Sequence, residues 1–160
     1  TIISRPQFDK VQGYIALGRS LPGAVALECS QLPQAPRLAE GFFVRPVLFT
    51  GLDNQSRVAR EEIFGPVTCV IPFDTEEEAL AMANDSDFGL AASVWTRDLA
   101  VALRAGSTVE GRFVRVTQAQ VAGPNLSYGG FKQSGLGKEL TLESMLEHFT
   151  RSKSVLINFE

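Results

Sequence analysis

Six consecutive residues near the middle of the chain, Glu61-Glu62-Ile63-Phe64-Gly65-Pro66, combine two carboxylates, an aromatic ring and a backbone break. Adjacent carboxylates are candidates for general acid–base chemistry. No second feature of the sequence supports a catalytic pair of carboxylates. Charged side chains beside a Gly-Pro break usually face solvent. Composition alone therefore predicts a surface turn that follows a short helix and precedes an apolar strand.

The other side chains that could act as nucleophiles, bases or metal ligands are few. Cys69 lies inside an apolar run, Cys29 follows another, and His148 is the only histidine and stands beside Glu147. A nucleophilic cysteine needs a low pKa, commonly from a helix N-terminus or a nearby cation. Neither cysteine has such a neighbour in the sequence, so packing roles are predicted for both. With one histidine, neither a zinc site nor a serine–histidine–aspartate triad is supported, and no metal site is predicted.

The glycine-rich segment over residues 129–138 resembles a phosphate-binding loop only at first sight. Lys138 is followed by Glu139 where a phosphate-binding loop has Ser or Thr, and no buried strand precedes the segment. A dinucleotide fingerprint would need a third glycine after Gly135 and Gly137. These glycines are therefore interpreted as permitting tight turns and a close approach of the backbone.

Helices and strands alternate along the sequence that surrounds these residues. Capping residues and apolar spacing predict helices that begin at residues 4, 56, 75 and 98, and a last amphipathic helix over 142–149. Apolar or alternating runs predict strands over 24–29, 42–49, 67–73, 90–96, 112–117 and 155–159. Residues 106–111 are predicted as a loop, and residues 118–137 as a long loop without periodicity. Pro46 interrupts one predicted strand, which indicates an edge or a bulge.

Strands that alternate with helices predict an α/β fold with a largely parallel sheet. The run over 155–159 is a strand at the end of the chain with no evident partner. We expect it to extend a sheet of another subunit.

Bulk properties narrow the function classes. The chain has 160 residues and a net charge of −3, so electrostatics give no case for binding nucleic acid or an anionic membrane. No apolar run reaches the roughly 20 residues that a membrane span needs. Two cysteines in apolar surroundings favour the reducing cytoplasm, although two are also enough for one disulfide. The chain does not begin with Met. Two explanations are that the sequence starts inside a longer protein and that an initiator Met was removed. The first is the preferred hypothesis.

Residues 61–66 resemble the Glu-Glu-Ile-Phe-Gly-Pro signature of the NAD(P)-dependent aldehyde dehydrogenases. Further segments similar to the C-terminal part of that family follow in the same order and at approximately the same spacing. They are residues 83–92, 94–98, 128–139 and 153–155. The resemblance covers essentially the whole chain. It implies an incomplete catalytic domain over residues 1–152, with helices on both faces of a largely parallel sheet, and an oligomerisation strand over 153–160.

The resemblance also implies roles for individual residues. Glu62 would accept hydrogen bonds from the nicotinamide ribose, which suits a carboxylate because it is an acceptor only. Phe64 would pack on the same end of the cofactor, and Leu90 would lie near the nicotinamide. Ala122 and Tyr128 would line the entrance for the aldehyde, where an aromatic ring suits an apolar substrate.

The chain departs from the family pattern at several points. Ser127-Tyr128 stands where the family usually has Pro-Phe, Thr117 stands where it usually has Asn, and the loop over 105–112 looks longer than is typical. The family's cysteine nucleophile, its general-base glutamate and the phosphate-binding half of its cofactor domain precede the region that Thr1 begins. No catalytic residue is therefore predicted in this chain, and tight binding of NAD or NADP is expected only in the complete protein.

Three hypotheses follow. The leading one is the C-terminal portion of an aldehyde dehydrogenase that forms homo-oligomers through its terminal strand and is inactive when isolated. The second is a natural module, either a non-catalytic scaffold or one subunit of a split enzyme whose partner chain carries the nucleophile. The third is a nonfunctional remnant, which should fold poorly because a truncated sheet leaves an apolar edge exposed.

Overall fold

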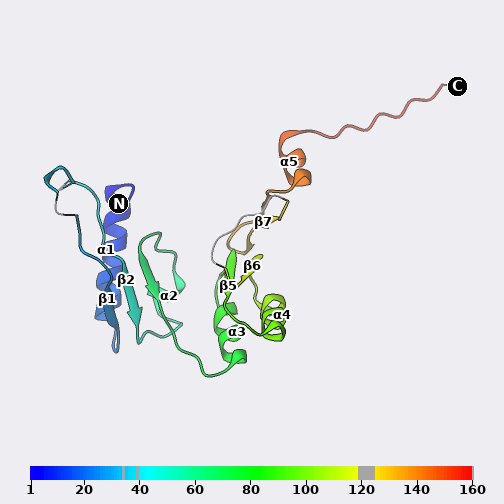
Figure 1. Ribbon diagram of the computed structural model, residues 1–160. Coiled ribbons are helices and arrows are strands. Elements are labelled where there is room, and N and C mark those ends of the chain that lie inside the picture. The colour runs from blue at the N-terminus through cyan, green and yellow to red at the C-terminus, as the bar shows by residue number, and fades with distance from the viewer. Residues whose placement is uncertain (34, 39, 119–124, 160) are drawn as a thin grey trace. The chain divides into compact units, whose positions relative to one another are not determined.

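The structure is a computed structural model that describes residues 1–33, 35–38, 40–118 and 125–159, shown in Figure 1. The chain forms two compact units, Thr1–Asp74 and Thr75–Glu160. The first unit contains α1 (Arg5–Ser20), β1 (Val25–Glu28), the 3₁₀ helix η1 (Pro36–Leu38), β2 (Val47–Thr50), α2 (Arg57–Arg60) and β3 (Val67–Cys69). The second contains α3 (Glu76–Asn84), β4 (Phe88–Gly89), β5 (Ala91–Val94), α4 (Leu99–Thr108), β6 (Phe113–Val116), β7 (Tyr128–Gly129), β8 (Phe131–Lys132), β9 (Lys138–Glu139) and α5 (Leu142–Phe149).

The first unit is built around one face of α1. Ser4 caps this helix by accepting a hydrogen bond from the Gln7 backbone N–H, and a proline stands in the first turn, as predicted. Three strands lie in the order β1–β2–β3, with β1 antiparallel and β3 parallel to β2. Val11 and Ile15 of α1 pack with Phe49 of β2 in the buried core. Gly18 permits this approach, since a Cβ there would lie 2.5 Å from Cζ of the Phe49 ring.

In the second unit, the parallel strands β5 and β6 are joined by a crossover that contains α4. Asp98 caps α4 by accepting hydrogen bonds from the backbone N–H groups of Ala100 and Val101, as its position in the sequence predicts. The buried residues of α4 are Ala102 and Ala105. Their small side chains allow the helix to pack closely.

Two short antiparallel pairs complete the second unit. β4 pairs with β8, and β7 pairs with β9. The prediction of a loop over residues 118–137 is therefore wrong in part, because β7 and β8 lie within it. A strand of two residues is too short to show periodicity in the sequence. These strands can be identified only from their pairing with distant residues in the structure.

The strands of the described residues form four small sheets rather than the one largely parallel sheet that was predicted. The α/β class is confirmed, but the predicted sheet arrangement is not. Two boundaries were also wrong. The strand predicted over 42–49 begins only after Pro46, which has no N–H to donate to a ladder. Helix α4 continues through Gly106 to Thr108, and the Val109 N–H bonds to Ala105 O at its end.

Residues 150–159 have no regular secondary structure. A strand needs a partner for its backbone groups. The oligomerisation strand over 153–160, and the domain boundary before it, therefore stay predictions. Within the ranges that the structure describes, no helix is long and apolar enough to cross a membrane.

Candidate functional site

The loop over residues 61–66 is held by one face of α1. Gln7 Nε2 donates to the carbonyl oxygens of Ile63, at 2.7 Å, and Phe64, at 3.1 Å. Lys10 Nζ donates to the carbonyl oxygen of Glu62 at 2.8 Å. Residues three and four apart lie on the same face of a helix, so these side chains act on the loop together with Val11 and Tyr14.

Close packing fixes the backbone at the two apolar ends of the loop. Ile63 is buried in the core beside Val11. A Cβ at Gly65 would lie 2.5 Å from Cγ2 of Val11, so only glycine fits without a shift of the helix. Phe64 lies between these anchors with φ of 53°, in the left-handed region that bulky residues rarely adopt. The anchors therefore hold a strained backbone at Phe64, which is typical of binding and catalytic sites.

The two adjacent glutamates have different surroundings. Glu61 accepts hydrogen bonds from Arg57 Nε at 2.7 Å and Nη2 at 3.0 Å, and from the Tyr14 hydroxyl. The hydrogen bonds from Arg57 and then Tyr14 lower the pKa of Glu61 to about 2. The same hydrogen bond to Glu61 raises the pKa of Tyr14. Glu61 is therefore an ionised structural group that joins the loop to α1 and α2.

Glu62 and Phe64, by contrast, point their side chains into solvent. The Glu62 carboxylate is exposed and has no hydrogen-bond or ion-pair partner among the residues that the structure describes. The Phe64 side chain is 75% exposed, and Lys10 Nζ lies 6.0 Å from its ring centroid. An acceptor-only carboxylate beside an exposed ring on a fixed backbone is suited to a ligand that has hydroxyl groups next to a flat apolar ring.

In the second unit, the structure links the predicted site residues Leu90 and Tyr128 through Phe113. The carbonyl oxygen of Leu90 accepts a hydrogen bond from the Phe113 N–H at 3.1 Å. The rings of Phe113 and Tyr128 meet edge to face with centroids 5.8 Å apart. Leu90 is 39% exposed. Phe113 was missed by sequence reasoning because it reads as one apolar position of an alternating strand. Ala122, also predicted for the substrate pocket, lies outside the described residues.

Side chains of the glycine-rich segment bond to other parts of the second unit. Lys132 Nζ donates to the carbonyl oxygens of Asn84 at 2.7 Å and Ser86 at 3.0 Å, and forms an ion pair with Glu110 at 2.6 Å. Ser134 Oγ accepts from the Gly89 N–H at 2.9 Å. These contacts fasten the backbone on the N-terminal side of Leu90.

Arg112 was not predicted as part of this region. Its guanidinium carbon lies 5.5 Å from the centroid of the Phe131 ring, and Nη2 donates to Ser127 Oγ at 3.2 Å. The Arg112 Nε is buried and has no hydrogen-bond partner in the described part of the chain. Ser127, where the chain departs from the family pattern, therefore bonds to a cation, a contact that the sequence did not predict.

Neither cysteine has the surroundings of a nucleophile. Burial raises the pKa of Cys69, which disfavours the reactive thiolate. Cys29 is exposed, and its thiol donates a hydrogen bond to the carbonyl oxygen of Leu27 at 3.8 Å. Over residues 1–33, 35–38, 40–118 and 125–159, no group of three His, Cys, Asp or Glu side chains could hold a metal ion.

Comparisons with known proteins identify the family. The model of the aldehyde dehydrogenase family matches residues 1–155. A betaine aldehyde dehydrogenase from Mesorhizobium japonicum is 40% identical over 156 residues, which cover 98% of this chain and 32% of that protein. An aldehyde dehydrogenase from Deinococcus radiodurans is 39% identical, covering 98% of this chain and 30% of that protein.

Solved structures agree with the family match. The NAD⁺ complex of an aldehyde dehydrogenase from Bacillus cereus superposes with a TM-score of 0.86 at 33% identity, covering 99% of this chain and 31% of that one. An indole-3-acetaldehyde dehydrogenase bound to NAD⁺ has a TM-score of 0.81 at 38% identity, covering 89% of this chain and 28% of that one. The chain spans about a third of the length of the curated relatives it matches. It belongs to the aldehyde dehydrogenase family.

Proposed function

We propose that these residues form part of an enzyme that oxidises an aldehyde to a carboxylic acid with NAD⁺ or NADP⁺. The observation that carries the proposal is the exposed Glu62 carboxylate, which has no partner among the described residues, beside the exposed Phe64 ring on a loop whose backbone α1 holds. Family membership and the NAD⁺ named in two similar structures support the same chemistry. The donor set also fits, because a ribose presents hydroxyl donors and a carboxylate accepts two of them.

In this proposal the chain binds and orients but performs no covalent step. Glu62 would hold the nicotinamide ribose, Phe64 would pack on that end of the cofactor, and Leu90 would limit the space near the nicotinamide. The bound cofactor would supply a hydride acceptor. Ala122 and Tyr128 would line the aldehyde entrance, where Phe113 supports the Tyr128 ring.

The isolated chain is proposed to be inactive. Oxidation of an aldehyde by this family chemistry needs an activated thiolate, and the pKa of Cys69 is raised rather than lowered. Cys29 has no cationic group bonded to it among the described residues. The nucleophile would come from residues beyond these 160, in the same polypeptide or in a partner chain. Glu62 and Phe64 would contact one end of the cofactor only, so tight binding by the chain alone is not expected.

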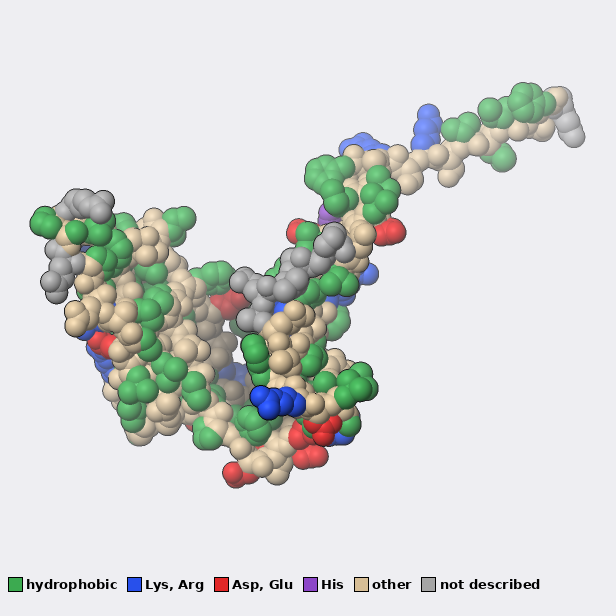
Figure 2. Space-filling model, viewed as in Figure 1, with side chains coloured by type: hydrophobic (Ala, Val, Ile, Leu, Met, Phe, Trp, Pro, Cys, Tyr) green, Lys and Arg blue, Asp and Glu red, His purple; other side chains and the backbone are tan. Residues whose placement is uncertain are grey.

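Homo-oligomer formation through the C-terminal segment is part of the proposal. Figure 2 shows hydrophobic side chains along the end of the chain, and Leu156 and Phe159 are 99% and 93% exposed. The apolar residues of α5 are also exposed. An extended apolar segment is suited to pairing with a strand of another subunit.

A chimera tests the proposed function. The matching third of the Bacillus cereus aldehyde dehydrogenase would be replaced by this chain, and NADH formation would be measured with an aldehyde substrate. Glu62→Ala should raise KM for NAD⁺ about tenfold, since a hydrogen bond to a charged group contributes about 1.5–3 kcal/mol. Glu77→Ala, which removes an exposed carboxylate of α3, is the matched control and should leave KM unchanged.

Two results would overturn the proposal. The first is a Glu62→Ala chimera that is indistinguishable from the Glu77→Ala chimera in KM for NAD⁺. The second is aldehyde-dependent NADH formation by the pure 160-residue chain, which would show that the chain holds its own nucleophile.

A further inference from the structure

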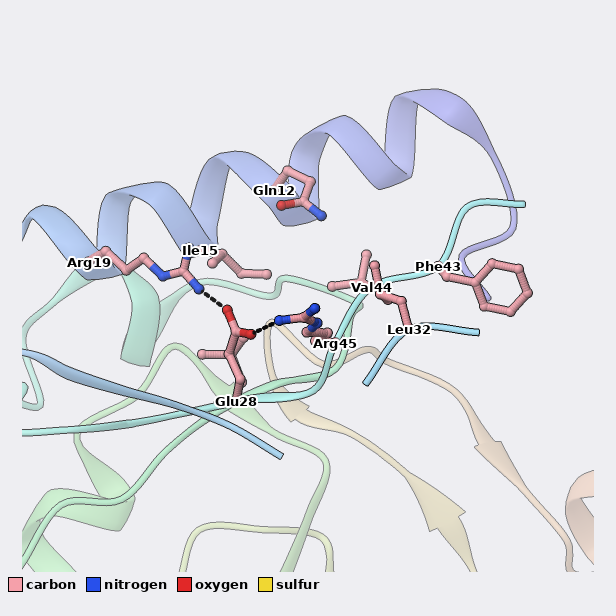
Figure 3. Close-up of a pocket in the computed structure, with 9 residues that line it drawn as sticks. Gln12, Ile15, Arg19, Glu28, Leu32, Phe43, Val44 and Arg45 are labelled. Atoms are coloured by element: carbon pink, nitrogen blue, oxygen red, sulfur yellow. Dashed lines mark hydrogen bonds and ion pairs between the residues drawn. The ribbon is translucent and has the colours of Figure 1, made fainter. Parts of the chain in front are cut away.

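A second candidate binding site lies in the first unit, away from the loop over residues 61–66. A cavity of about 150 Å³ lies between α1, the end of β1 and the segment that precedes β2. Figure 3 shows the residues that line it. Ile15 and Arg19 contribute from α1, Glu28 from β1, and Val44 and Arg45 from the segment before β2. No residue of the loop over 61–66 lines this cavity.

The cavity has an excess of positive charge. Arg19 Nη2 bonds to one oxygen of the Glu28 carboxylate, and Arg45 Nη1 bonds to the other at 2.5 Å. Figure 3 shows the carboxylate between the two guanidinium groups. The hydrogen bond from Arg45, and then that from Arg19, lowers the pKa of Glu28, so this carboxylate is ionised. Two guanidinium groups therefore face one carboxylate, and one positive charge is left unbalanced.

Both guanidinium groups keep donors for a second anion. A guanidinium has five N–H donors, and each of these makes a single hydrogen bond to Glu28. In the part of the chain that the structure describes, neither group has another hydrogen-bond partner. The Arg19 and Arg45 side chains are 49% and 45% exposed, so an anion from solvent can reach them. A planar carboxylate matches the geometry of such donors.

Apart from the amide of Gln12, the other residues that line the cavity are apolar. Ile15 is buried, and Val44 and Leu32 face the cavity beside it. Figure 3 shows Val44 and Leu32 on the side of the cavity opposite Arg19. A cavity of about 150 Å³ lined by such side chains has room for a body the size of benzene. The cavity thus has a net charge of +1 at the end formed by Arg19, Arg45 and Glu28, and apolar side chains beside it.

We propose that this cavity binds a small organic monocarboxylate, with its carboxylate on Arg19 and Arg45 and its hydrocarbon body against Ile15, Val44 and Leu32. A single negative charge balances the single excess positive charge. An inorganic dianion such as phosphate would leave the apolar wall uncovered and would bring two charges towards Glu28. The proposal does not depend on the proposed function, because it involves neither the cofactor loop nor the aldehyde entrance.

Titration of the ¹⁵N-labelled 160-residue chain with benzoate, followed by NMR, tests the site. Saturable shifts of the Arg19, Glu28 and Arg45 amides are expected. Benzyl alcohol has the same ring without the charge, and inorganic phosphate has charge without the ring, so both should bind at least about tenfold more weakly. Equal binding of benzyl alcohol would overturn the ionic half of the proposal, and equal binding of phosphate would overturn the apolar half.

Two substitutions with opposite expected effects separate the site from simple loss of structure. Arg45→Gln should weaken benzoate binding about tenfold, because it removes a charge-assisted hydrogen bond. Glu28→Gln should tighten it several-fold, because the competing carboxylate is gone, and a misfolded chain could not produce that gain. Arg104→Gln is the matched control, since Arg104 forms a similar exposed pair with Glu76. Unchanged affinity in Arg45→Gln, or weaker binding in Glu28→Gln, would overturn the proposal.

Discussion

Glu61 and Glu62 show how two identical neighbouring side chains acquire different tasks. Glu61 bonds to Arg57 and Tyr14 and joins the loop to two helices. Glu62 keeps its carboxylate in solvent while Lys10 binds its backbone carbonyl. The first residue therefore contributes to stability, and the second is available to a ligand.

The pH dependence of stability should report on Glu61. Its pKa falls from 4.5 to about 2 on folding, so its contacts stabilise the fold above pH 4.5 and are lost as the pH falls towards 2. Glu61→Gln should therefore lower the free energy of unfolding more at pH 6 than at pH 3, as measured by urea denaturation. Arg57→Gln removes the main cause of the shift and should give the same pattern. A stability difference that does not change between the two pH values would contradict this assignment.

Thr117 is a strained residue at the end of β6. Its φ is 52°, a left-handed conformation that a β-branched residue rarely adopts, although its Oγ1 donates to the Thr96 carbonyl at 2.8 Å. Asn tolerates this conformation and keeps a polar side chain. Thr117→Asn should raise the free energy of unfolding by about 1 kcal/mol, because it relieves part of the strain.

Thr117→Ala serves as the control for that substitution. Alanine keeps the steric cost of a Cβ at positive φ and loses the hydrogen bond, so it should lower stability by about 1 kcal/mol. The two variants should move in opposite directions in urea denaturation. Equal stabilities of the Asn and Ala variants would rule out strain at Thr117.

Among the elements, α1 does most to shape the loop over residues 61–66. Its Gln7 and Lys10 side chains bond to three consecutive carbonyl groups of the loop, and Val11 packs against Gly65. Because a helix repeats every 3.6 residues, one face can hold a whole loop while the opposite face stays in solvent. Because α1 holds the backbone of the loop at these points, the side chain of Phe64 is left exposed.

Two glycine substitutions should distinguish the face of α1 that contacts the loop from the face that is exposed to solvent. Gly65→Ala places a Cβ 2.5 Å from Val11 Cγ2 and should lower the free energy of unfolding by about 1–3 kcal/mol through overpacking. Gly13→Ala, inside α1 with nothing within 4 Å, should raise it by about 0.5–1 kcal/mol through helix propensity. Chemical denaturation measures both. A neutral Gly65→Ala variant would show that the loop is not packed against α1.

The molecule as a whole leaves apolar side chains uncovered at its C-terminal end. Leu142 and Phe149 of α5 are largely exposed, as are Leu156 and Phe159 beyond it. Exposed apolar side chains that gather in one segment are consistent with the proposal that another chain covers this surface. Residues 150–159 have no regular secondary structure.

Self-association should depend on backbone pairing in this segment. Ile157→Pro removes an N–H that a strand must donate and should shift the chain from oligomer to monomer in sedimentation experiments. Ile157→Val keeps both the N–H and the strand preference, and should leave the association unchanged. If the Pro variant still associates like the Val variant, the C-terminal segment is not the interface.

Much of the local structure followed from the sequence. Ser4, Thr75 and Asp98 were predicted as helix caps, and each accepts a hydrogen bond from a backbone N–H in the first turn. Capping depends on residues within four positions of one another, so it can be predicted from the sequence. The family was also predicted from short motifs and is confirmed by the comparisons.

Tertiary structure decided what depends on residues far apart in the sequence. The family resemblance singled out Glu62, but the contacts that separate the two glutamates could not be derived from the sequence. Arg57 lies only four residues from Glu61, whereas Tyr14 and Lys10 lie more than 40 positions from the glutamates they contact. The short ladders between β4 and β8 and between β7 and β9 arise in the same way. By itself, the sequence determined the family, most helix starts and the α/β class, since these depend on local chemistry. Strand pairing, the backbone strain at Phe64 and the exposure of Glu62 were decided by packing between distant segments, which no local pattern encodes.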